Sequence, residues 1–82
     1  MLSKKLQSEL LVGSLDAETS MARISAIREV ADAEQSETFS FDRQGYETLA
    51  TTIAEMAEGV NGDFRAAYCD VAQRVQNHAR SL

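Results

Sequence analysis

The sequence of 82 residues has no proline and no tryptophan, and it has one cysteine, one histidine, three phenylalanines and two tyrosines. A lone cysteine excludes an intrachain disulfide, and with a single histidine it cannot supply the four ligands of a structural zinc site. The longest apolar run, Leu10-Leu11-Val12, is too short for a signal-peptide core or a membrane helix. One unpaired cysteine is typical of a reducing compartment. We therefore expect a cytoplasmic protein that does not enter a membrane.

The net charge of −5 is unevenly distributed along the chain. Residues 14–38 hold six acids against two arginines (−4), and residues 39–60 hold four acids against one arginine (−3). The two ends, residues 1–13 and 61–82, each carry +1. Because an acidic middle repels phosphate, binding to nucleic acid is disfavoured, and a protein with a basic surface is the natural partner.

Good helix formers dominate the sequence, and no stretch alternates apolar and polar residues as a strand would. The sequence therefore predicts an all-α fold, a small bundle of three or four helices that forms a single domain over residues 1–82. Domains of this size are only marginally stable, and many gain stability from a partner subunit.

The C-terminal half predicts an antiparallel helical hairpin. Asp42 is the expected N-cap of its first helix, with Phe41 and Tyr46 placed as a hydrophobic staple. Gly59 is expected to end that helix in the left-handed conformation, and Asp63 to cap the next one. Apolar residues recur at helical spacing in both helices. They are Tyr46, Leu49, Ala50, Ile53, Met56, Ala57 and Val60 in the first, and Phe64, Ala67, Tyr68, Val71, Ala72, Val75, His78, Ala79 and Leu82 in the second.

The N-terminal half allows two interpretations. Gly13 and Ser14, followed by Asp16 and Glu18, form a stop signal and then a start signal, which favours two helices and a four-helix bundle. One apolar stripe nevertheless keeps its phase across this point, as a single long helix would. Its members are Leu2, Leu6, Leu10, Gly13, Ala17, Met21, Ile24, Ile27 and Ala31. A continuous helix would leave an apolar overhang that a second chain must cover.

A second stripe of mostly small residues runs along the other face of residues 15–33. It consists of Leu15, Ala22, Ala26 and Ala33. The simpler interpretation is a solvated face, or one that the first helix covers; the alternative is a self-association surface that would form a homodimer.

Residue chemistry gives little support to catalysis. Cys69 has no histidine on its helical face, and His78 lies at the edge of an apolar stripe without a visible nucleophile or orienting acid. No phosphate-binding loop, catalytic triad, metal-ligand spacing or cofactor motif is present. We expect neither an enzyme nor a bound cofactor or metal.

An acidic cluster near the end of the second helical segment, together with two phenylalanines in the loop after it, is the best candidate for a partner-binding site. The residues are Glu29, Asp32, Glu34, Glu37, Phe39 and Phe41. The alternatives are a solvated charged face and phenylalanines that close the end of the core. We expect a small acidic adaptor, inhibitor or regulator that binds a partner protein, of a type found in bacterial and phage regulation. Two other functions stay open: a DNA-binding helix-turn-helix regulator that uses the hairpin, and a structural homo-oligomer subunit.

Overall fold

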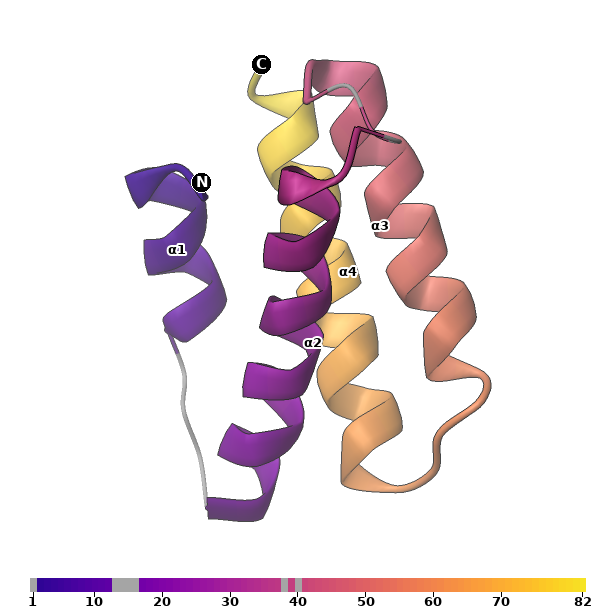
Figure 1. Cartoon of the computed structure of the whole chain (residues 1–82). Coiled ribbons are helices and arrows are strands. Elements are labelled where there is room, and N and C mark those ends of the chain that lie inside the picture. The colour runs from indigo at the N-terminus through magenta and orange to yellow at the C-terminus, as the bar shows by residue number, and fades with distance from the viewer. Residues whose placement is uncertain (1, 13–16, 38, 40) are drawn as a thin grey trace.

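The computed structural model describes residues 2–12, 17–37, 39 and 41–82, and this part of the chain folds into four α-helices (Figure 1). The helices are α1 (Lys4–Leu11), α2 (Ala17–Gln35), α3 (Arg43–Ala57) and α4 (Asp63–Arg80). The predicted all-α class is confirmed, as is the four-helix alternative, because α1 ends at Leu11 before α2 begins at Ala17. No β-strand occurs among the described residues.

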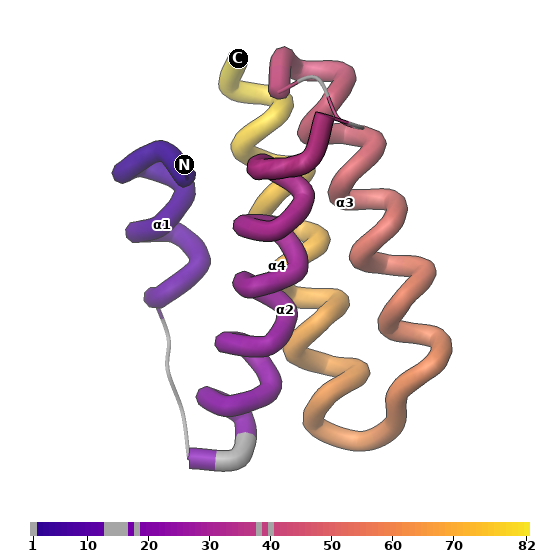
Figure 2. The backbone as a smooth tube through the Cα atoms, viewed as in Figure 1, coloured from indigo at the N-terminus to yellow at the C-terminus, as the bar shows by residue number. Residues whose placement is uncertain are grey.

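Helix α4 is the centre of the bundle, and the other three helices pack on it (Figures 1 and 2). Helices α3 and α4 form the predicted antiparallel hairpin and share the most extensive contact. Helix α2 packs more extensively on α4 than on α3, and the short helix α1 lies against α4 on the side away from α3. The largest fully buried side chains come from all four helices: Leu6, Leu10, Val30, Leu49, Ile53, Val71 and Val75.

The start of α3 forms as the sequence predicts. The carboxylate of Asp42 accepts a hydrogen bond from the backbone N–H of Gly45 at 2.8 Å, which satisfies a donor that the helix itself leaves free. The rings of Phe41 and Tyr46 lie with their centroids 5.4 Å apart, so the predicted staple is confirmed.

The connection from α3 to α4 differs from the prediction. Gly59 is not left-handed; α3 ends in tightened turns in which the N–H of Gly59 donates to the carbonyl of Met56 at 3.0 Å. The positive φ of +63° belongs to Gly62, which is the N-cap of α4 without a side-chain cap, and Asp63 is the first residue inside the helix. The sequence predicted the position of the turn correctly, but it assigned the positive φ to Gly59 when Gly62 adopts it.

The buried face of α2 also differs from the face that the long apolar stripe predicts. Met21 and Ile24 are 65% and 47% exposed, whereas Ala22 and Ala26 are fully buried, as is Val30. The small side chains allow α2 to approach α4 closely, which larger residues at those positions would prevent. The self-association interpretation is therefore wrong for Ala22 and Ala26, whose side chains lie inside their own chain. Ala33 is partly buried against the core, and Leu15 lies outside the described residues.

A group of ion pairs fixes the end of α1 to the bundle. The Asp70 carboxylate accepts from Arg23 Nη2 at 2.9 Å and from Arg74 Nε at 3.0 Å. The same two guanidinium groups donate to backbone carbonyls at the end of α1: Arg23 to Val12 at 2.7 Å and Arg74 to Glu9. These contacts satisfy carbonyl groups that a helix end leaves without partners. Asp70 on α4 thus orients two arginines that hold α1 in place.

Candidate partner-binding groove

A groove of about 280 Å³ lies between the C-terminal half of α2 and the middle of α3. Helix α2 packs more extensively on α4 than on α3, and this space remains between α2 and α3. Its lining consists of Glu29, Asp32, Ala33 and Ser36 from α2 and the segment after it, Phe39 from the loop, and Leu49, Thr52, Ile53 and Met56 from α3. We call this feature the acidic groove.

The groove combines an apolar floor with an acidic edge. Leu49 and Ile53 are almost fully buried and form part of the floor, whereas Glu29 and Asp32 are exposed. The two carboxylates are three residues apart, which places them on neighbouring turns of the same side of α2. No lysine or arginine is among the described residues that line the groove, so the field of these acids is not neutralised within it. The arrangement suits a ligand that presents an apolar group flanked by positive charge.

The structure divides the predicted acidic cluster into two parts. Glu29 and Asp32 line the groove, while Glu37 is exposed and does not line it. Glu34 is half-buried and faces the other way, toward Tyr46. Burial of the Tyr46 hydroxyl raises its pKa above the ordinary 10.0, and the negative charge of Glu34 raises that pKa further. Glu34 therefore acts on the interior of its own chain.

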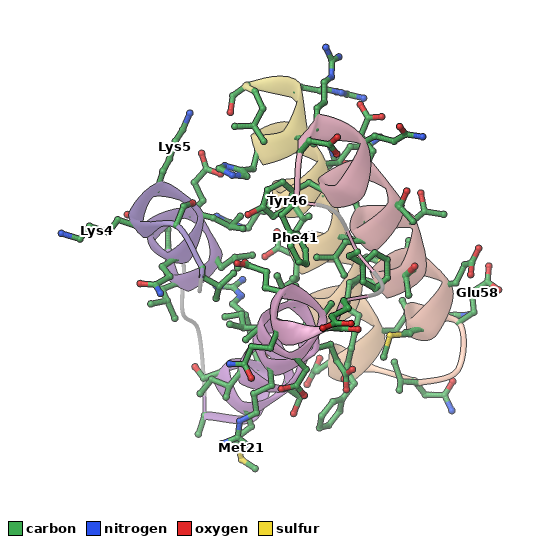
Figure 3. All side chains as sticks on the ribbon, turned by 45° about the horizontal axis from the view of Figure 1, so that its top comes forward. Lys4, Lys5, Met21, Phe41, Tyr46 and Glu58 are labelled. Atoms are coloured by element: carbon green, nitrogen blue, oxygen red, sulfur yellow. The ribbon has the colours of Figure 1, made fainter. Side chains whose placement is uncertain are left out.

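The two phenylalanines of the loop also have different surroundings. Phe41 packs on the core and against Tyr46, and it lies beside Tyr46 at the centre of Figure 3. Phe39 is partly exposed, lines the acidic groove, and lies with its ring centroid 6.3 Å from that of Phe41. The interpretation that phenylalanines close the end of the core thus fits Phe41, whereas Phe39 belongs to the groove wall.

Sequence reasoning missed the contribution of α3 to this site. Leu49, Ile53 and Met56 belong to an apolar stripe that the hairpin alone would account for, so nothing marked them as part of a groove. Thr52, which borders the stripe, donates its hydroxyl to the Thr48 carbonyl at 3.0 Å and remains partly exposed. The polar residue at the border of the α3 stripe was the one sequence signal that α2 leaves part of this face of α3 uncovered.

Other parts of the described chain show less that points to a ligand. A cavity of about 360 Å³ between α1 and α4 is lined by Glu9, Asp70, Gln73, Arg74 and Asn77. Asp70 and Arg74 form an ion pair with each other, and Arg74 also donates to the backbone carbonyl of Glu9. Buried His78 lies edge-on to the Tyr46 ring, with the two ring centroids 4.9 Å apart. Among the described residues, no three histidine, cysteine or acidic side chains are grouped as metal ligands would be.

The arginines of α4 bear on the helix-turn-helix alternative. Arg74 donates to the Asp70 carboxylate and to the backbone carbonyl of Glu9, and Arg65 Nε donates to the Ala57 carbonyl at 3.3 Å. A recognition helix uses basic side chains that are directed outward and free to contact DNA. Both of these arginines make hydrogen bonds within the fold, although Arg65 is itself exposed. None of the helices within the described ranges is long and apolar enough to span a bilayer.

No protein-family model matches this chain, and comparisons with curated proteins and with solved structures find no match either. The function is therefore argued from the geometry of the groove.

Proposed function

We propose that this protein is a small interaction module that binds a basic, amphipathic segment of another protein in the acidic groove between α2 and α3. The observation that carries the proposal is an apolar floor edged by the exposed carboxylates of Glu29 and Asp32, with no cationic side chain among the described lining residues. Proteins recognise amphipathic helices by placing their apolar face in such a groove.

The dimensions of the groove support a peptide side chain as the proposed occupant. A volume of about 280 Å³ lies just below the range typical of small-molecule sites. It accommodates one or two apolar side chains of a peptide, whose flanking lysines or arginines then reach Glu29 and Asp32. Exposed charges of this kind steer association and set specificity, while buried anchor residues supply most of the affinity.

The first test is a binding measurement with a defined probe, a short amphipathic helix of leucine and lysine, compared with its leucine and glutamate analogue. We expect the basic probe alone to bind, and to shift the backbone amide signals of Asp32, Thr52 and Met56. Each carboxylate of the acidic edge, Glu29 or Asp32, contributes at most about 1 kcal/mol to the binding free energy, because the site is exposed. The two contributions together are at most about 2 kcal/mol, so the combined change Glu29→Lys and Asp32→Lys should weaken binding by roughly ten- to thirtyfold.

Matched controls separate the groove from general charge effects. Glu58→Lys reverses an exposed acid at the end of α3 that does not line the groove, and it should leave affinity nearly unchanged. For the apolar part, Phe39→Ala should weaken binding, whereas Phe64→Ala, at a 37% exposed position on α4, should not. If Glu58→Lys weakens binding as much as the combined variant of Glu29 and Asp32 does, the groove is not the binding site.

A further inference from the structure

The two ends of the acidic groove differ in chemistry. Helices α2 and α3 run in opposite directions and are joined by the loop that contains Phe39 (Figures 1 and 2). The end of the groove nearest this loop is therefore lined by Ser36 and Phe39, and the opposite end by Glu29 and Met56. Asp32 lies four residues before Ser36, which places the two side chains on neighbouring turns of the same side of α2. One aromatic ring and one carboxylate thus belong to the same half of the groove.

Phe39 has a chemical role open to it that Phe41 does not have. Phe41 packs on the core and against Tyr46, so it closes the end of the bundle. Phe39 is partly exposed and lines the groove. The face of an aromatic ring carries a negative partial charge and attracts a cation. The ring of Phe39 and the exposed carboxylate of Asp32 therefore attract the same kind of ligand group.

We propose that the acidic groove prefers arginine to lysine in the segment it binds, with the guanidinium group stacked on Phe39 and hydrogen-bonded to Asp32. This inference rests on the proposed function and names the side chain that the groove recognises. A guanidinium group is planar and weakly hydrated, stacks on aromatic rings, and can donate two parallel hydrogen bonds to one carboxylate. The ammonium group of lysine is compact and strongly hydrated, so it loses more hydration when it moves onto a ring.

The rest of the lining fits a helical segment that carries this arginine. Leu49 and Ile53 on the floor accept an apolar side chain of the ligand, which on a helix stands three or four residues from the arginine. Glu29 lies three residues from Asp32, about 4.5 Å along α2, and attracts a second cation of the ligand. Only the cation beside Phe39 contacts a ring, so the preference for arginine is confined to that position.

The test is calorimetric titration of the whole chain with two probes that differ only in their cations. One is the leucine and lysine helix used above, and the other has arginine in place of each lysine. The arginine probe should bind about two- to fivefold more tightly, which is the effect of one cation–π contact at an exposed site. Phe39→Leu keeps an apolar side chain but removes the ring, so it should abolish most of this difference by weakening the arginine probe. Phe39→Tyr keeps an aromatic face and should retain the preference.

The control is Phe64→Leu, which changes a phenylalanine of α4 that is 37% exposed and does not line the groove. It should leave the preference unchanged, and intermolecular NMR contacts should join the δ-methylene protons of an arginine in the probe to the Phe39 ring. Equal affinity for the two probes, or a preference for arginine that persists in Phe39→Leu, overturns this inference and leaves the proposed function in place. Failure of both probes to bind overturns the proposed function and this inference together.

Discussion

Replacing Asp70 with alanine tests whether a shared carboxylate holds α1 to the bundle. Asp70 accepts from two guanidinium groups at 2.9 and 3.0 Å, and the side chain of Arg23 is only 10% exposed. A hydrogen bond to a charged group contributes about 1.5–3 kcal/mol when well buried. The Asp70 side chain is itself 37% exposed, so solvent screens part of this contribution. We expect the variant to lose about 2–3 kcal/mol of unfolding free energy, which lowers Tm by roughly 8–24 °C.

The exposed pair of Arg43 and Glu47 supplies the control, because it has the same i, i+4 spacing as the pair of Arg74 and Asp70. Its side chains are 60% and 46% exposed, so Glu47→Ala should cost no more than about 0.5 kcal/mol. Alanine also has a higher helix propensity than aspartate, by up to about 0.7 kcal/mol, a bias that works against the predicted loss.

The assay is urea unfolding of both variants, followed by hydrogen exchange of the amides of α1. In Asp70→Ala those amides should exchange faster than in Glu47→Ala, since the arginines that satisfy the carbonyls of Glu9 and Val12 lose their orientation. Equal destabilisation in the two variants, with unchanged exchange in α1, would refute this account of how the helix is held.

Three other predictions concern the interior and the turn. Gly62→Ala places a side chain on a residue with a φ of +63° and should lower the free energy of unfolding by about 1–3 kcal/mol. Gly59→Ala should be neutral or stabilising, because an added Cβ meets only the Met56 carbonyl, at 3.5 Å. Chemical denaturation that finds Gly59→Ala less stable than Gly62→Ala would contradict this turn geometry. The ring ¹³C shift of Tyr46 should titrate at a pH above 10.0, and in Glu34→Gln the midpoint should lie closer to 10.0. Because the pKa is raised in the folded state, the contribution of Tyr46 to stability is fully present below pH 10.0 and is lost as the pH rises through the folded-state pKa. Ala26→Leu should lower the free energy of unfolding by roughly 1–3 kcal/mol through overpacking, and an unchanged Tm would mean that this face of α2 is not buried.

The hairpin could be predicted because its determinants are local. The apolar residues of α3 and α4 form one stripe each, and the cap and staple at Asp42, Phe41 and Tyr46 lie within a few residues of one another. The assignment of the two glycines in the turn could not be made in this way. Either glycine tolerates a left-handed conformation, and the choice depends on how α3 ends in tightened turns and on the path into α4.

The orientation of α2 could not be read from its own sequence, because the helix has two faces that could be buried. The face with Met21 and Ile24 has the larger apolar residues, yet the face with Ala22, Arg23 and Ala26 lies inside. Part of the reason is a charge pairing between residues 47 positions apart, Arg23 and Asp70, which no local pattern contains. A buried arginine needs such a partner, so the pair and the orientation of the helix depend on one another.

The same orientation explains why the candidate site could be predicted only in part. Glu29, Asp32 and Phe39 stood out through their charge and aromatic character, but the α3 side of the groove depends on how far α2 stands from α3. Glu34 belongs to the same run of acids and yet faces Tyr46, because a difference of two positions from Asp32 turns a side chain to the other side of a helix.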